Sequence, residues 1–195
     1  MRKAEISRKT NETEIIASVD LDGTGLTDIA TGIGFLDHML TLLGKHSGMD
    51  LAVQCKGDLY VDGHHTVEDL GIVLGQAFQK ALGDKRGIRR YGSARIPMDE
   101  ALVSVDLDIS GRPFLSVNAD FNSPKVGDFD TSLVEEFFRA LSQNSGITLH
   151  ISCLSGKNDH HIIEGMFKAF ARAFREAAEI DPRFATEIPS TKGIL

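Results

Sequence analysis

The chain repeats itself once along its length, and this internal repeat constrains the fold more than any other feature of the sequence. Residues 18–22 (SVDLD) recur letter for letter as residues 104–108. Two further blocks match in the same order, 35–40 with 133–138 and the histidine pair at 64–65 with the pair at 160–161. We therefore divide the 195 residues into two halves of one fold, 1–92 and 93–195. No linker rich in Pro, Gly or Ser separates the halves, so we expect one compact unit.

Each half is predicted to fold as ββαβα. Apolar residues alternate with polar ones in the first strand, which is typical of a half-exposed strand, and apolar stripes at helical spacing predict two helices. The predicted strands are 17–22, 49–55, 103–109, 115–121 and 147–153, with a short one at 59–61, and the predicted helices are 35–43, 64–81, 133–141 and 160–177. The pattern predicts an α+β fold, a tandem repeat with helices packed on one face of mixed or antiparallel sheets.

Composition and charge exclude several classes of function. The net charge of −7 argues against a general nucleic-acid binder or membrane-surface binder. No apolar run approaches the roughly 20 residues of a membrane span. The first residues lack the apolar core of a signal peptide, and two cysteines, Cys55 and Cys153, are too few for a disulfide framework. We therefore expect a cytoplasmic protein with reduced cysteines.

Histidine and carboxylate side chains recur at matched positions of the repeat, in a pattern typical of metal ligands. His64, His65 and Glu68 fall on one helical turn, and His160, His161 and Glu164 repeat that turn. The candidate ligands form two parallel sets, His38, His64, His65 and Glu68 in the first half and Glu136, His160, His161 and Glu164 in the second. Imidazole and carboxylate without thiolate suit Mn, Fe, Zn or Ni, and a carboxylate-rich set favours Mn.

The two histidines of each pair are adjacent, and this limits how they bind. Adjacent helical residues point about 100° apart, so one pair cannot easily serve one metal. Each pair would instead donate one imidazole to each of two metals, at a junction between the halves or between subunits. The alternative is an ordinary helix N-terminus in which the carboxylate complements the helix dipole.

Basic residues stand out in this acidic chain as candidate phosphate contacts. They lie at residues 85–90, at Arg112 in a turn, at Lys168 one helical turn after Glu164, and in the PSTKG segment at 189–193. Arg suits bidentate phosphate binding, and Lys binds phosphate as a point charge. For residues 85–90, a cationic helix C-terminus is the alternative interpretation.

Four motifs together resemble one known family. They are GFLDHML at 34–40, DGHHTVED at 62–69, GKNDHHIIE at 156–164 and PSTKG at 189–193. They look like imidazoleglycerol-phosphate dehydratase of histidine biosynthesis, and the resemblance runs from about Glu5 to Gly193. It implies ββαβα units similar to ribosomal S5 domain 2. It also implies two Mn²⁺ per active site and a homo-oligomer of 24 subunits with metals bound between subunits.

The resemblance also implies roles for individual residues. The metal ligands would be the eight named above, although several relatives have His where this chain has Glu136. Glu12 matches a family carboxylate near the reacting carbons, and it is our candidate for acid–base catalysis. The other residues matched to substrate binding are His38, His46, Arg90, Asp99, Arg112, Lys168, Ser190, Thr191 and Lys192.

The reaction implied is the elimination of water from D-erythro-imidazole-glycerol phosphate to give imidazole-acetol phosphate. We expect two metals to bind both ring nitrogens and hold the ring as imidazolate, so that the hydroxyl departs with electron density from the ring. Two alternatives stay open on the residues alone. One is a two-metal phosphoester hydrolase, and the other is a non-catalytic metal-binding cage protein.

Overall fold

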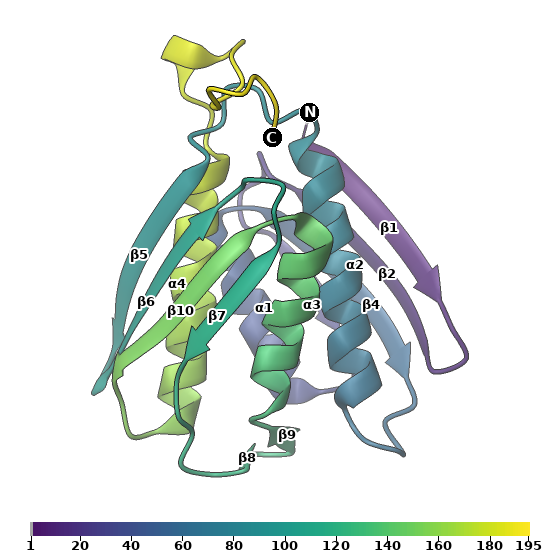
Figure 1. The fold of residues 1–195 in the computed structure, drawn as a ribbon. Helices are drawn as coiled ribbons and strands as arrows, with labels where there is room; N and C mark the ends of the chain where they lie inside the picture. Colours follow the sequence, from purple (N-terminus) through teal and green to yellow (C-terminus); the bar gives the residue numbers. More distant parts are fainter. Residues whose placement is uncertain (1) are drawn as a thin grey trace.

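Two four-stranded sheets enclose four α-helices in the computed structural model, which describes residues 2–195 (Figure 1). The first half contains β1 (Lys3–Lys9), β2 (Thr13–Asp20), β3 (Thr27–Ala30), α1 (Gly34–Ser47), β4 (Asp50–Gly57) and α2 (His64–Leu82). The second contains β5 (Tyr91–Met98), β6 (Ala101–Asp108), β7 (Phe114–Asn118), β8 (Lys125–Val126), β9 (Phe129–Asp130), α3 (Leu133–Ser145), β10 (Thr148–Ser155), α4 (Asp159–Ala178) and the 3₁₀ turn η1 (Pro182–Phe184). The predicted α+β repeat is confirmed.

The two sheets have the same mixed topology. Their strand orders are β1-β2-β4-β3 and β5-β6-β10-β7, with β3 and β7 parallel to the neighbouring strand and the remaining pairs antiparallel. Along β2, Ile15, Ala17 and Val19 are buried against the helices, whereas the residues between them face outward. This period of two explains why the strands could be recognised from sequence.

Each half begins with one more strand than the predicted ββαβα. β1 and β5 are edge strands, and each buries a single residue, Ala4 or Gly92. Their sequences therefore lack the regular alternation of apolar and polar residues that predicts a strand. The predicted boundary after residue 92 falls inside β5. The chain crosses from the first half to the second slightly earlier, in the connection from Leu82 at the end of α2 to Tyr91 at the start of β5. Residues 59–61, predicted as a short strand, form a turn because they have no strand partner in the described part of the chain.

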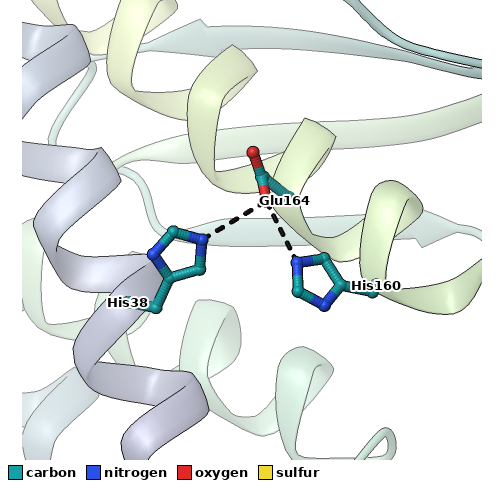
Figure 2. Close-up of side chains that lie close together, drawn as sticks. All are labelled: His38, His160 and Glu164. Carbon is teal, nitrogen blue, oxygen red and sulfur yellow. Dashed lines mark hydrogen bonds and ion pairs between the residues drawn. The ribbon is translucent and has the colours of Figure 1, made fainter.

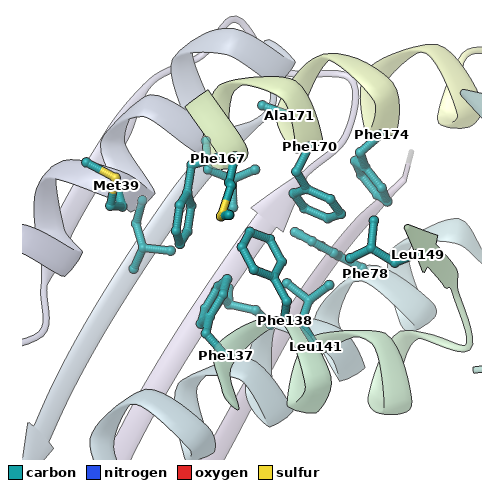
Figure 3. Close-up of a cluster of buried hydrophobic side chains, with 14 of the residues drawn as sticks. Met39, Phe78, Phe137, Phe138, Leu141, Leu149, Phe167, Phe170, Ala171 and Phe174 are labelled. Carbon is teal, nitrogen blue, oxygen red and sulfur yellow. The ribbon is translucent and has the colours of Figure 1, made fainter. Parts of the chain in front are cut away.

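The two halves pack through their helices. α2 packs against α3, and α1 packs against α4. Phenylalanines also join the two pairs, since Phe78 of α2 stacks on Phe174 of α4 with 4.7 Å between ring centroids (Figure 3). Glycine allows the closest approach. A Cβ atom on Gly71 would lie 2.7 Å from the carbonyl oxygen of Phe137, and one on Gly75 would lie 2.7 Å from that of Leu141. Buried residues of both halves form one hydrophobic cluster, and this packing fixes the four helices relative to one another.

The four helices point the same way, with their N-termini at one end of the molecule. His38 near the start of α1 lies beside His160 at the start of α4, and Gly63 before α2 lies beside Leu133 at the start of α3. The first backbone N–H groups of a helix have no partner within the helix, and its N-terminus carries a partial positive charge, which favours carboxylates nearby. Within residues 2–195, no helix has the length and hydrophobicity to cross a membrane.

Candidate metal centre and substrate site

A pocket of about 880 Å³ opens where the four helix N-termini meet. It is lined by the first residues of α1, α2 and α3 and by His160 of α4, and the β8–β9 hairpin forms one wall. Three of the predicted ligands, His38, His64 and His160, line this one pocket. The fold therefore gathers histidines that are far apart in the sequence.

Three predicted ligands come together beside this pocket. Nε2 of His38 lies 3.4 Å from Oε2 of Glu164, and Nε2 of His160 lies 3.1 Å from the same oxygen (Figure 2). One ligand atom from each of these residues lies within 4.8 Å of the others. His38 comes from the first half, whereas His160 and Glu164 come from the second, so this group draws on both of the sets listed from sequence. α1 packs against α4, so the group lies at the junction between the halves, one of the two junctions considered from the sequence.

Lys168 completes this group from the next turn of α4. Its Nζ lies 2.5 Å from Oε1 of Glu164, and both side chains are largely buried. Burial alone would raise the pKa of Glu164, but hydrogen bonds from Lys168, His160 and His38 outweigh it and lower the pKa. The carboxylate is therefore held in its charged, ligand-competent form. His46 lies close by, where burial and the charges of Lys168 and Arg172 lower its pKa.

The histidines within each pair diverge, as expected for adjacent helical residues. The rings of His64 and His65 are 6.1 Å apart with planes at 82°, and those of His160 and His161 are 6.2 Å apart at 81°. His160 faces Glu164, whereas His161 faces Glu100. The two imidazoles of one pair thus face two different carboxylates.

The second histidine of each pair is anchored by a carboxylate through Nδ1. His65 Nδ1 lies 3.0 Å from Oδ2 of Asp58, and His161 Nδ1 lies 2.8 Å from Oε2 of Glu100. These hydrogen bonds raise the pKa of both histidines. The contact with His161, together with backbone N–H groups of Asn158 and Lys157, lowers the pKa of Glu100 to about 2. Such an anchor fixes the ring and leaves Nε2 as the ligand atom.

Glu12 and Asp99 face the free nitrogens of these two histidines. Oε1 of Glu12 lies 3.5 Å from Nε2 of His65, and Oδ2 of Asp99 lies 3.8 Å from Nε2 of His161. Both carboxylates sit in corresponding hairpin turns, β1–β2 and β5–β6. The two halves therefore repeat a carboxylate beside a histidine at the same place in the fold.

The remaining predicted ligands do not assemble. Nε2 of His64 lies 3.9 Å from Oε2 of Glu68, one turn later on α2. Glu136, on the neighbouring α3, is paired instead with Arg139 at 2.7 Å. In the described part of the chain, the His38, His160 and Glu164 group is the one cluster with metal-ligand spacing.

Most of the predicted phosphate contacts lie at the opposite end of the molecule. Arg90 donates to both carboxylate oxygens of Asp108, at 2.7 and 3.1 Å, and to the carbonyl of Pro189 at 2.9 Å. Arg112 is exposed and lies 3.6 Å from Asp108. Ser190, Thr191 and Lys192 follow Pro189 in the C-terminal segment, so they belong to the same end of the molecule as Arg90 and Arg112. Lys168 remains beside Glu164.

The length of α4 sets the distance between the metal-binding end and the basic end of the molecule. Arg90 N donates to the carbonyl of Ala177, in the last turn of α4, whereas His160 is in its first turn. At 1.5 Å per residue these positions are about 25 Å apart. A small phosphorylated ligand cannot bridge that distance within one chain.

Comparison with known proteins decides the family. The family model for imidazoleglycerol-phosphate dehydratase matches residues 31–174. The chain belongs to the imidazoleglycerol-phosphate dehydratase family. A relative of that name from Cereibacter sphaeroides (strain KD131 / KCTC 12085) is 62% identical over 195 residues, covering all of both chains. Another, from Azorhizobium caulinodans, is 60% identical and covers 100% of this chain and 99% of its own length.

Solved structures of imidazoleglycerol-phosphate dehydratases share the fold. The Staphylococcus aureus enzyme is 46% identical, covers 92% of this chain and 99% of its own, and superposes with a TM-score of 0.84. The Pyrococcus furiosus enzyme, solved in complex with (S)-C348, is 37% identical, covers 97% and 100%, and also gives 0.84. Membership of this dehydratase family makes the chain a hydro-lyase of histidine biosynthesis, as the motifs predicted.

Sequence reasoning missed the carboxylates that anchor the histidines of this dehydratase site. Asp58 follows β4, and Glu100 lies in the β5–β6 turn. They come from different loops in the two halves, so the repeat gives no matching signal for them. The ion pair between Arg139 and Glu136 was also not predicted, although two such residues at i and i+3 on a helix favour pairing.

Proposed function

We propose that this hydro-lyase depends on manganese, with two Mn²⁺ per active site, and converts D-erythro-imidazole-glycerol phosphate into imidazole-acetol phosphate and water. The observation that carries the proposal is the convergence of His38, His160 and Glu164 beside a pocket that His64 also lines. Imidazole and carboxylate donors without thiolate suit this metal.

The side chains present fit a metal of this kind. The ligand atoms of His38, His160 and Glu164 are already within 4.8 Å of one another, and Lys168 keeps Glu164 charged. His65 and His161 have Nδ1 anchored by carboxylates, which is the usual outer contact of a metal-binding histidine. The full set of proposed ligands is His38, His64, His65, Glu68, Glu136, His160, His161 and Glu164. When bound, the metal would supply Lewis-acid charge stabilisation and orient the imidazole ring.

The remaining chemistry falls to side chains of the protein. The hydroxyl departs from the carbon beside the ring, and the proton is removed from the next carbon, which gives an enol that becomes the ketone. That proton is poorly acidic because no carbonyl adjoins it, so its removal needs a positioned base. Glu12 is about half exposed and carries a carboxylate 3.5 Å from His65, so it can accept that proton and return one to the departing hydroxyl. Asp99 and His46 would line the substrate. Lys168 would bind its phosphate, together with Arg90, Arg112, Ser190, Thr191 and Lys192.

The distance between the two ends of the chain supports an assembly of subunits. Ala177, where Arg90 joins α4, lies about 25 Å along the helix from His160, and Arg90 in turn contacts Pro189 and Asp108, the partner of Arg112. We propose that the basic end of one copy meets the metal-binding end of another in a homo-oligomer, of 24 subunits by resemblance. Each active site would then be complete only in the assembly.

One assay tests metal dependence and reaction together. The protein is stripped with a chelator and given back Mn²⁺, Zn²⁺ or Mg²⁺ separately, and imidazole-acetol phosphate and inorganic phosphate are measured. We expect loss of activity on stripping and full recovery of the ketone product with Mn²⁺. Full activity in the stripped protein would overturn metal dependence. Release of inorganic phosphate would favour the phosphoester hydrolase, and metal binding without any turnover would favour the cage protein.

A further inference from the structure

We infer that Asp69 is a positioning residue for Glu12, an inference that rests on the proposed role of Glu12 in acid–base catalysis. Asp69 lies on α2, directly after Glu68, and is 6% exposed. It belongs to none of the metal-ligand or substrate-contact sets. Its Oδ2 accepts hydrogen bonds from Nη1 of Arg8 at 2.7 Å and from the Thr13 hydroxyl. These two donors lie on β1 and β2, on either side of the turn that carries Glu12.

The turn itself is held tightly between these two strands. The Thr10 hydroxyl oxygen accepts from the backbone N–H of Glu12 at 3.1 Å and of Thr13 at 2.9 Å. On the other side, the N–H of Asp58 donates to the carbonyl of Glu12 at 3.0 Å. Thr13 therefore connects the Glu12 turn to the buried Asp69. Asp58 connects the same turn to His65, whose ring its carboxylate anchors.

The second half holds its equivalent turn in a different way. In the repeat, Gly165 takes the place of Asp69, and a Cβ atom there would lie 3.0 Å from Cγ2 of Val103. The equivalent turn is instead held by its own Glu100, which accepts from the N–H groups of Lys157 and Asn158. In the second half, Glu100 therefore both holds the turn and anchors His161, and Asp99 faces His161. In the first half these two tasks are divided: Asp69 and Asp58 hold the turn, Asp58 anchors His65, and the carboxylate of Glu12 faces His65.

The two hydrogen bonds to Asp69 should hold the Glu12 turn in a fixed position. Breaking one would leave a donor or the buried carboxylate without a partner away from water, which is unfavourable. A displacement of about 1 Å in a reacting group can lower turnover by about a hundredfold. Loss of the Thr13 hydrogen bond should therefore appear in kcat, and not in metal content or in KM.

Thr13→Val tests the inference, because it removes the hydroxyl and keeps the shape of the side chain. Thr13→Ser is the matched control, because it keeps the hydroxyl, and Asp69→Asn is a second variant that weakens the anchor from the other side. We expect Thr13→Val to lower kcat by about tenfold to a hundredfold. Metal content and KM should stay within about twofold of those of the wild type, and Thr13→Ser should retain kcat.

A double-mutant cycle with Glu12→Gln separates positioning from general damage. If Thr13 and Asp69 act through Glu12, Thr13→Val should lower kcat no further in the Glu12→Gln background. An equal further loss in that background would overturn the inference, as would wild-type kcat in Thr13→Val while Glu12→Gln is impaired. Wild-type kcat in Glu12→Gln would instead overturn the proposed role of Glu12 and the inference with it.

Discussion

His38 and Glu164 belong to different halves of the repeat, yet Nε2 of His38 lies 3.4 Å from Oε2 of Glu164. The contact exists because α1 of the first half packs against α4 of the second. Neither half alone contains this group of ligands. The duplication therefore builds the candidate metal centre at the junction of the halves, where the fit between helices also sets the geometry of the ligands.

Glu164→Gln should remove metal and turnover together. The change keeps the size of the side chain but removes the charge shared by His38, His160 and Lys168. We expect the metal content per chain to fall by at least half. Turnover should fall by at least about a thousandfold, because the loss of about 4 kcal/mol of transition-state stabilisation has that effect. Glu135→Gln on α3, exposed and paired with Arg139, is the control that should keep both. Retained activity in a metal-free Glu164→Gln protein would exclude this site.

Lys168→Ala should chiefly raise KM. The ammonium group lies beside Glu164 in a largely buried position and is the one predicted phosphate contact at the metal-binding end. Loss of a charge-assisted contact of about 1.5–3 kcal/mol predicts a KM about 10 to 150 times higher. Steady-state kinetics check this, with the exposed Lys56→Ala as the control. An unchanged KM would remove Lys168 from phosphate binding.

Sequence patterns predicted the repeat, the four helices, the strands with clear alternation and the divergence of the paired histidines. They could not predict β1 and β5, because an edge strand with one buried residue carries almost no periodic signal. Nor could they show that His38 joins His160, because helix pairing between halves depends on the complementary shapes of two surfaces. Close approach at Gly71 and Gly75 is one part of that fit.

Gly71→Ala should destabilise the protein through the α2–α3 contact. The added methyl group would lie 2.7 Å from the Phe137 carbonyl and 2.8 Å from Cβ of Ala140, so the two helices must move apart. Overpacking of this kind costs about 1–3 kcal/mol. The control is Gly34→Ala in the first turn of α1, where a Cβ atom meets nothing within 4 Å. Chemical denaturation should show a lower free energy of unfolding for Gly71→Ala alone, and equal values for both variants would contradict the packing argument.

Cys55 should react slowly with thiol reagents while the protein is folded. Burial, together with the charges of Asp69 and Asp37, raises the pKa of its thiol to about 11 from an ordinary value of 9.0. A raised pKa means less thiolate at any pH below it, so at pH 8 the reactive fraction is about a hundredfold smaller than in the unfolded chain. Mass spectrometry of alkylation at Cys55 over pH 7–9, with and without denaturant, measures the ratio. Equal rates in both conditions would show that the thiol is not shielded.

Two inactive variants should restore activity to each other if the active site spans two subunits. Glu164→Gln removes a ligand at one end of the chain, and Arg112→Ala removes an exposed basic group at the other. In a mixed assembly formed by co-expression, some sites receive an intact metal-binding end from one variant and an intact basic end from the other. With equal, random mixing and two chains per site, about a quarter of the sites would be intact. Activity near that fraction, absent when the purified homo-oligomers are simply combined without exchange, would support a shared site. No activity in verified mixed assemblies would place every essential group of a site within one chain.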